Sequence, residues 1–202
     1  MARSHHPRAR RPAAFLAAGA LGVSALTGAG IAVTAVPAFA DAPAADAQAA
    51  RFEEDFLKDM IDHHAMAVMM AEMCVDKAVH PELVSTCESI IASQSAQIEQ
   101  MQGWLQDWYG ATHEPDMTGM QSMHRLMELD GAEFEIAFMR SMIRHHWGAI
   151  REAETCLHNA EHPELLGLCE DIYAAQLGEI EQMQTWLAQW YDVRGGRPVE
   201  TA

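Results

Sequence analysis

Two pairs of adjacent histidines are the residues of this chain best suited to chemistry. His63 and His64 stand in the segment MIDHHAMA, and His145 and His146 stand in MIRHHWGA. Each pair falls on or beside the apolar stripe of an expected helix, where a buried imidazole needs a polar partner. Imidazole binds copper, zinc, iron and nickel, so the repetition predicts metal binding by at least one histidine of each pair. The alternative is that all four are structural residues of a core.

Methionine thioethers gather around the same segments, and the chain contains 14 methionines. Met60 and Met142 each precede a histidine pair by one helical turn. Thioether sulfur is a soft ligand, and beside imidazole it narrows the choice of metal toward Cu(I). Four more methionines follow the first histidine pair, at Met66, Met69, Met70 and Met73.

The second half of the chain does not keep these four methionines. The aligned positions hold, in the same order, Gly148, Arg151, Glu152 and Thr155. Because the same fold accepts polar groups there, we expect Met66, Met69 and Met73 to point away from the core stripe, and Met70 to lie on its flank near His63. They would then form a soft metal-binding face or an oligomer interface rather than fill the core.

A third group of soft ligands stands between the two halves, in the segment MTGMQSMHRLM. Its candidate ligands are Met117, Met120, Met123 and His124, followed by Met127. Their spacing of three or four residues would place the sulfur atoms on one side of a short helix over residues 117–129, or around one ion. The alternative is a lid helix that packs its methionines on the rest of the domain.

Four cysteines flank the two expected turns symmetrically. Cys74 and Cys87 enclose the first turn, and Cys156 and Cys169 enclose the second. Antiparallel helices bring the members of each pair level, so we expect disulfides Cys74–Cys87 and Cys156–Cys169 in an exported protein. Thiolate metal ligation is the alternative, but no C-x-x-C motif supports it.

The elements that position these residues come from an internal duplication. The segments that begin at Phe52 and Phe134 align without a gap at an offset of 82, with about half of the positions identical. Each copy predicts two helices separated by a His-Pro turn, and no segment alternates as a strand does. Two antiparallel hairpins, each with one apolar face, predict an all-α four-helix bundle joined by the Met-rich connector.

The same patterns set the expected boundaries. Residues 1–40 have a basic start, an apolar run and a final Ala-x-Ala, and are therefore predicted to be a signal peptide cleaved after Ala40. An uncleaved membrane anchor is the alternative. The remaining segments are a flexible linker over 41–50, a bundle over 51–192 with repeats at 51–110 and 131–192 around a connector at 111–130, and a tail over 193–202.

The charge of the chain limits its partners. It contains 13 basic and 29 acidic residues, a formal net charge of −16, and the expected leader removes four arginines and no acid. Nucleic acid and anionic membranes are therefore poor partners, and no nucleic-acid partner is expected, whereas metal ions are favoured. Copper-handling proteins of the cell envelope and a second copy of the chain are the expected protein partners.

Paired M-I-x-H-H helices, E-Q-M-Q-x-W-L second helices and the M-x-x-M connector resemble the secreted family catalogued as domain of unknown function 305. The resemblance covers about residues 51–192. It implies a ferritin-like four-helix bundle and, for the copper-binding members, extracytoplasmic copper binding through methionine and histidine. Carried over by position, it implies ligands at Met60, His63, His64, Met117, Met120, Met142, His145 and His146.

The expected function is therefore that of an exported copper-binding buffer or carrier that favours Cu(I), with copper ion as its ligand and no organic cofactor. We expect no enzymatic activity. A ferritin-like iron oxidase is one alternative, but the chain has no E-x-x-H motif, and Glu72, Glu99, Glu154 and Glu181 fall outside the apolar stripes. A metal-free interaction protein of the envelope is the other. Haem attachment lacks its C-x-x-C-H motif.

Overall fold

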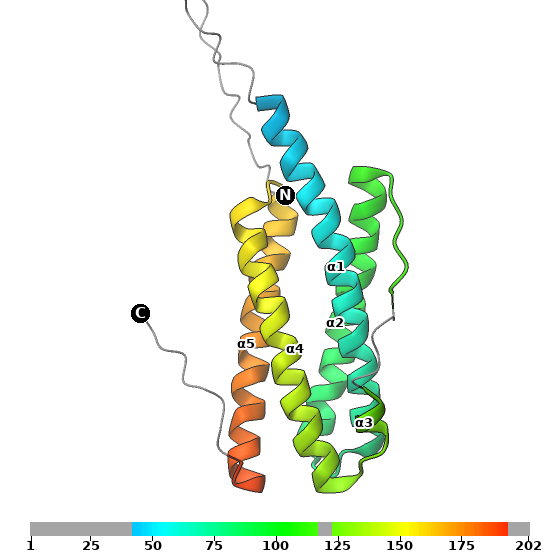
Figure 1. Cartoon of the computed structure of the whole chain (residues 1–202), viewed down its shortest axis with the longest axis vertical. Helices are drawn as coiled ribbons and strands as arrows, with labels where there is room; N and C mark the ends of the chain where they lie inside the picture. The colour runs from blue at the N-terminus through cyan, green and yellow to red at the C-terminus, as the bar shows by residue number, and fades with distance from the viewer. Residues whose placement is uncertain (1–41, 117–122, 194–202) are drawn as a thin grey trace, which may run out of the picture. The chain divides into compact units, whose positions relative to one another are not determined.

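The part of the chain that the structure describes, residues 42–116 and 123–193, is built from helices only (Figure 1). The structure is a computed structural model. Its helices are α1 (Ala42–Lys77), α2 (Pro81–Tyr109), α3 (His124–Met127), α4 (Gly131–Asn159) and α5 (Pro163–Tyr191). The predicted all-α class is confirmed. The expected leader, residues 1–40, lies outside the described residues, as do residues 117–122 and 194–202.

Each hairpin turns at its His-Pro pair, as predicted. His80 and His162 have extended backbone, and Pro81 and Pro163 occupy the first turn of the helix that follows. A proline is tolerated there because the N–H that it lacks would have no partner within the helix. The two long helices on either side of each turn therefore run antiparallel.

The first helix starts earlier than the sequence predicted. The segment 41–50 was expected to be a flexible linker, but α1 begins at Ala42 and continues through it without a break. Six of the nine residues from 42 to 50 are alanine, the residue with the highest helix propensity, and Pro43 stands in the first turn. The high helix propensity of these alanines is enough to extend α1 to Ala42, although the segment has no apolar stripe to pack.

The two hairpins pack mainly through their first helices. α1 packs against α2 and α4 packs against α5 within each hairpin, while α1 and α4 form the principal contact between hairpins. Figure 1 shows α1 and α4 side by side in the middle of the bundle, between α5 and α2. We call the middle of their contact, where the histidine pairs lie, the crossing of α1 and α4. The histidine pairs are on these two central helices.

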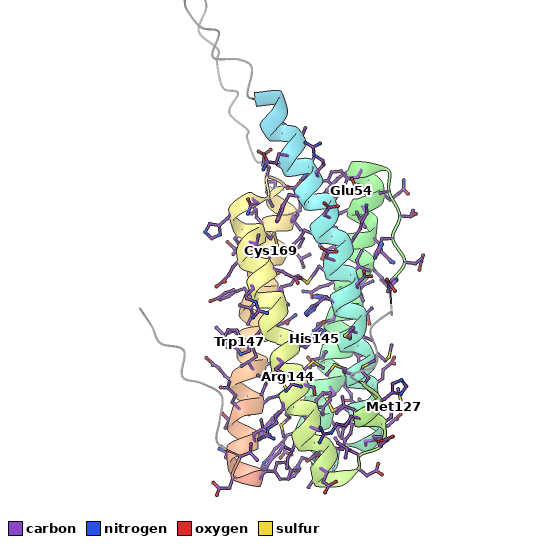
Figure 2. The ribbon with its side chains drawn as sticks, in the orientation of Figure 1. Glu54, Met127, Arg144, His145, Trp147 and Cys169 are labelled. Atoms are coloured by element: carbon purple, nitrogen blue, oxygen red, sulfur yellow. A yellow bond between two sulfur atoms is a disulfide. The ribbon has the colours of Figure 1, made fainter. Side chains whose placement is uncertain are left out.

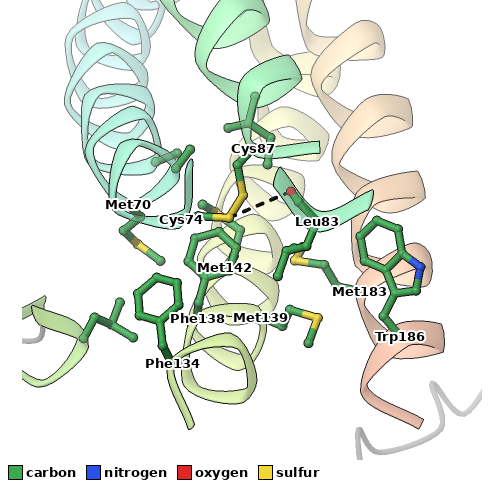
Figure 3. Packing of buried hydrophobic residues seen from close by; sticks show 14 of the residues in the cluster. Met70, Cys74, Leu83, Cys87, Phe134, Phe138, Met139, Met142, Met183 and Trp186 are labelled. Carbon is green, nitrogen blue, oxygen red and sulfur yellow. Dashed lines mark hydrogen bonds between the residues drawn. A yellow bond between two sulfur atoms is a disulfide. The ribbon is translucent and has the colours of Figure 1, made fainter. Parts of the chain in front are cut away.

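Two apolar clusters fill the bundle, one toward each end. The first contains residues of α1 from Ala67 onward and residues of α4 up to Met142, together with the Cys74–Cys87 disulfide (Figure 3). The second contains residues of α1 up to Ile61 and residues of α4 from Ala149 onward. Both histidine pairs fall in the gap between the clusters, so the middle of the bundle is a polar layer between two apolar ones.

The disulfides have the predicted connectivity. Cys74 bonds to Cys87 and Cys156 bonds to Cys169, and both pairs have 13 residues of sequence separation. The Cα atoms are 6.2 and 6.3 Å apart, which fits a bridge between adjacent helices. All four sulfur atoms are buried, so each bridge locks a hairpin close to its turn.

A buried glutamate ties each hairpin to the turn of the other. One carboxylate oxygen of Glu53 in α1 accepts the backbone N–H groups of Glu161 and His162 at 2.6 and 2.9 Å. The other accepts His162 Nδ1–H and the Tyr109 hydroxyl, both at 2.6 Å. Trp108 stacks on the His162 ring with 3.9 Å between centroids. We call this arrangement the first glutamate clamp.

The second glutamate clamp repeats the first at the opposite end of the bundle. Glu135 in α4 accepts the backbone N–H groups of Val79 and His80 at 2.6 and 2.8 Å. It also accepts His80 Nδ1–H at 2.6 Å and the Tyr191 hydroxyl, and Trp190 stacks on the His80 ring. Together the two clamps fix how far α1 and α4 can slide past each other, and hence which side chains meet at their crossing.

The connector is held against α1 where it leaves α2. Gly110 ends α2 with a left-handed φ of 62°, a conformation that glycine adopts without strain. His113 Nε2 and the backbone N–H of Asp116 both bond to one carboxylate oxygen of Asp62, at 2.7 Å each. The connector is thus attached one residue away from His63.

The end of the connector also docks on α1. Of the short helix expected over residues 117–129, the described residues contain only α3, from His124 to Met127, and residues 117–122 lie outside the described part. Lys77 at the end of α1 donates to the carbonyl groups of Met127 and Leu129 at 2.6 and 2.8 Å. Met123 and Leu126 are buried in the first apolar cluster.

Among the described residues, no helix is both long and apolar enough to cross a membrane.

Candidate metal centre

The two histidine pairs meet at the crossing of α1 and α4. The rings of His63 and His145 lie 3.7 Å apart between centroids, at an angle of 39°. His63 Nε2 lies 3.1 Å from the backbone carbonyl oxygen of His145. A carbonyl oxygen can only accept, so this contact places the ring proton of His63 on Nε2. Figure 2 shows His145 where α4 lies beside α1.

The other two histidines are fully buried, and each reaches back to the second helix of its own hairpin. His64 Nε2 lies 2.8 Å from the side-chain oxygen of Gln97 in α2. His146 Nε2 lies 2.6 Å from a carboxylate oxygen of Glu179 in α5. Both partners accept, so both rings carry a proton on Nε2 as well.

These contacts leave several ring nitrogens free to bind a metal. Among the described residues, the buried Nδ1 atoms of His63, His64 and His146 have no hydrogen-bond partner, and neither nitrogen of His145 has one. A buried polar atom without a partner is unfavourable, which indicates a function other than stability. Histidines that bind metals commonly donate their other ring N–H to a carboxylate or carbonyl oxygen. The centre has this arrangement three times.

Burial keeps most of the centre neutral. Desolvation lowers the pKa of His63 to about 4 and that of His64 to about 3. Desolvation, followed by repulsion from the neighbouring histidines, lowers the pKa of His145 to about 2. Only neutral imidazole binds a metal ion. Because these rings are already neutral at neutral pH, they need not lose a proton before they bind one.

The methionines next to the histidines are all in contact with the core. Met60 and Met142 are fully buried, and Met70 is buried in the first apolar cluster rather than lying on the flank of the stripe. Met66, Met69 and Met73 are half-buried and pack against that cluster.

The expectation that these last three methionines point away from the core is therefore wrong. Met123 and Leu126 of the connector belong to the same cluster, so this end of α1 has apolar neighbours that its own periodicity does not reveal. On α4 the matching Arg151 and Thr155 are exposed.

The connector residues are divided between the interior and the surface. Met123 is buried, whereas His124 and Met127 are exposed. Met127 lies at the outer side of α3 in Figure 2. Met117 and Met120 lie outside the described residues. The structure therefore does not bring Met123, His124 and Met127 to one face.

Gly148 determines the space on one side of the centre. A Cβ atom at this position would lie 3.1 Å from His63 Nε2, closer than the usual side-chain contact. The aligned residue of the first half is Met66. The environments of His63 and His145 therefore differ, even though the helices that carry them are repeats.

No group of three or more His, Cys, Asp or Glu side chains in the described residues is arranged to hold a metal ion. A metal at this centre would be bound by the unpartnered imidazole nitrogens, alone or together with methionine sulfur. Both are compatible with the donors found at the crossing.

The residues that bond to the histidines and to the turns were not predicted from the sequence. The buried histidines bond to Gln97 and Glu179, and the turns bond to Glu53 and Glu135. None of these four residues was a candidate in the prediction. The glutamates of the two clamps are aligned across the repeat, so a comparison of acidic positions between the halves could have found them. Glu72, Glu99, Glu154 and Glu181, which were considered, are all exposed.

Fold and centre together define a class of protein, an all-α bundle of two duplicated hairpins with histidines at the crossing of its central helices. The family described as Domain of unknown function (DUF305) matches residues 53–187, and the chain belongs to this family. The expected resemblance is thus confirmed.

Solved structures of related proteins have the same fold. CopM in the Cu(I)-bound form is 35% identical, with a TM-score of 0.64, over 69% of this chain and 97% of that chain. CopM in the Cu(II)-bound form is 34% identical, with a TM-score of 0.63 and the same coverage. A DUF305 protein from Streptomyces coelicolor, described as secreted, is 26% identical, with a TM-score of 0.64, over 73% and 97% of the two chains. No curated protein matches the chain.

Proposed function

We propose that this protein is an exported copper-binding protein, a buffer or carrier rather than a catalyst. The observation that carries the proposal is the set of buried, unpartnered Nδ1 atoms of His63, His64 and His146, whose opposite ring nitrogens donate to oxygen. Structures of CopM, at 34–35% identity, contain Cu(I), Cu(II) or silver. Copper is also the metal that best suits imidazole combined with thioether.

An exported location agrees with this function. The two disulfides suit an oxidising compartment, and the Ala-x-Ala site predicts cleavage near Ala40. A buffer or carrier outside the cytoplasm would pass copper to other copper-handling proteins of the envelope. The acidic surface favours the approach of cations.

The first experiment measures copper in the protein as isolated without chelator, followed by titration against a Cu(I) chelator and a Cu(II) chelator. Replacing both histidines of a pair with glutamine, His63 with His64 or His145 with His146, should reduce copper stoichiometry or affinity. The control is His158→Gln, an exposed histidine of α4 outside the centre. Absence of copper binding by the wild-type protein would overturn the proposal, as would unchanged binding by both pair variants.

A second experiment tests the soft ligands. Replacing Met66, Met69 and Met73 with leucine keeps their apolar bulk and removes the sulfur, and the triple variant Met117/Met120/Met123→Leu does the same for the connector. If the sulfurs bind Cu(I), stoichiometry under reducing conditions falls while the melting temperature stays nearly constant. Unchanged Cu(I) uptake in both triple variants would limit the site to the histidines.

The expected absence of catalysis is tested with the copper-loaded protein. Fe(II) oxidation and oxygen consumption should not exceed those of an equal concentration of the His145→Gln/His146→Gln variant. A rate that requires the intact centre would replace the carrier proposal with an oxidase.

A further inference from the structure

The two halves of the centre differ in the group that orients the buried histidine. His64 and His146 are equivalent in the duplication, are equally buried, and each donates Nε2–H to a residue 33 positions further along the chain. In the first hairpin this residue is Gln97, a neutral amide. In the second it is Glu179, a carboxylate.

This difference changes the chemistry of the free nitrogen. A carboxylate accepts a shorter and stronger hydrogen bond than an amide does, and the distances are 2.6 Å for Glu179 and 2.8 Å for Gln97. An acceptor with negative charge raises the electron density of the imidazole, so the opposite nitrogen becomes a better ligand. His146 Nδ1 is therefore the stronger donor of the two, although both atoms are buried and without a partner.

Glu179 also connects the buried histidine to the surface. It lines a hollow of about 460 Å³ between α2 and α5, together with small and polar residues that include Ser85, Ser89 and Gly178. Glu179 is the only acidic or basic residue in this lining, and its side chain is 21% exposed. Its carboxylate thus touches the hollow and His146 at once, whereas Gln97 does not line the hollow.

We propose that Glu179 is a positioning residue that makes His146 the preferred copper donor, so that loss of His146 costs more copper affinity than loss of the equivalent His64. This inference rests on the proposed function, because it assigns an order to ligands that the proposed function needs. The first hairpin, with Gln97 behind His64, provides the weaker donor of the two.

The repeat supplies the matched variants. Glu179→Gln gives the second hairpin the acceptor of the first, and Gln97→Glu does the reverse. With Cu(II) as the probe in chelator competition, Glu179→Gln should weaken binding by roughly tenfold, the lower limit for the loss of an orienting partner of a metal-bound histidine. Unfolding of each metal-free variant in urea controls for damage to the fold.

The decisive measurement combines these variants with the loss of one histidine. In the wild-type background, His146→Gln should weaken Cu(II) binding more than His64→Gln. In the exchanged background, Gln97→Glu with Glu179→Gln, the order should reverse. A role of Glu179 in stability alone would leave the order unchanged.

The outcomes separate the inference from the function on which it rests. If the wild-type protein binds no copper, the proposed function is wrong. If it binds copper but Glu179→Gln has unchanged affinity, or the order does not reverse, the assignment to Glu179 is wrong and the copper function remains. Reversal with intact folding supports the assignment.

Discussion

A histidine that is withdrawn from water resists protonation, and this gives the centre a measurable effect on stability. His63, His64 and His145 bind no proton in the folded protein at pH 5–6, because burial lowers their pKa values to about 4, 3 and 2. In the unfolded chain they regain a pKa near 6.5. The unfolded state then takes up more protons, so the free energy of unfolding falls as the pH is lowered below about 6.5.

We therefore predict that the metal-free protein loses stability between pH 7 and pH 5. Well below the unfolded pKa, each such histidine contributes about 1.4 kcal/mol per pH unit. Urea unfolding at several pH values measures the slope. His145→Gln removes one of these groups and should flatten the slope by that amount, and an unchanged slope would show that His145 is protonated in the folded state.

The same burial alters the expected competition between protons and copper. From ordinary histidine chemistry, copper binding would weaken as the pH falls through about 6.5. With the lowered pKa values of His63 and His64, this competition should begin near pH 4 as long as the protein remains folded. Chelator titrations at pH 7 and pH 5.5 should therefore give similar affinities after correction for the chelator.

Gly148 allows a test of the packing around His63. The Cβ of Gly148→Ala would lie 3.1 Å from His63 Nε2, so the ring must shift and its bond to the His145 carbonyl oxygen weakens. We expect weaker copper binding and little net change in stability, because the gain in helix propensity of about 1 kcal/mol is offset by crowding. Gly103→Ala is the control, since nothing lies within 4 Å of its added Cβ. It should stabilise α2 and leave copper binding unchanged.

The histidines were predictable from sequence as site residues, and the arrangement that makes them chemically distinct was not. The pair His63-His64 recurs as His145-His146, so local pattern and internal symmetry were enough to place four imidazoles on the apolar side of two helices. Which ring nitrogen is free depends on Gln97 and Glu179, more than 30 residues away on another helix. Met66 packs against a cluster that includes Met123 and Leu126 of the connector, and periodicity within α1 does not predict these neighbours.

At the scale of the elements, the glutamate clamps make a testable contribution to the stability of the fold. Burial by itself would raise the pKa of Glu53, but hydrogen bonds from Tyr109, from two backbone N–H groups and from the His162 ring overcome it and hold the pKa below its ordinary value. The pKa of Glu135 is lowered by the equivalent contacts. A carboxylate with a lowered pKa stabilises the fold above its unfolded pKa, and this contribution is lost as the pH falls through the folded value.

Glu53→Gln should therefore destabilise the protein at pH 7 by about 2 kcal/mol, the scale of hydrogen bonds to a charged group. Glu135→Gln should behave alike. The difference between either variant and the wild type should shrink as the pH drops below 4.5. Glu54→Gln is a matched control, because Glu54 forms only a partly exposed pair with Lys58 one turn away. It should change stability by at most about 0.5 kcal/mol.

The disulfides act on the same elements through the unfolded chain. Each closes a loop with 13 residues of separation, which in the chain-entropy model corresponds to about 3 kcal/mol. Replacing Cys74 and Cys87 together with alanine should lower stability by up to that amount and leave the helix content unchanged. Peptide mapping of the exported protein without reductant should yield the two predicted linkages, and a Cys74–Cys156 linkage would contradict the structure.

The helices and hairpins were predictable because duplication, apolar period and His-Pro turns agreed with one another. The start of α1 at Ala42 was missed because an alanine-rich segment has high helix propensity without an apolar stripe. The clamps were missed for a different reason. Glu53 contacts a turn more than 100 residues away, and a single sequence has no local signal for such a pair.

For the whole molecule, copper should act as a bond between hairpins, since donors from α1 and α4 meet at the crossing. We predict that copper raises the free energy of unfolding by about 2.7 kcal/mol at a free concentration one hundred times the dissociation constant. Thermal unfolding with and without copper measures this gain. His63→Gln with His145→Gln should reduce it, while the control His158→Gln should retain it.

The two glutamate clamps also bear on how such a molecule can arise. Each hairpin provides the glutamate, tryptophan and tyrosine that secure the turn of the other, so two identical hairpins related by a twofold axis would complete each other in the same way. This chain is equivalent to such a symmetric pair fused into one polypeptide. In a pair of identical subunits every substitution appears twice, whereas fusion lets the halves diverge separately. The replacement of Met66 by Gly148, and of Gln97 by Glu179, are differences that only the fused form can hold.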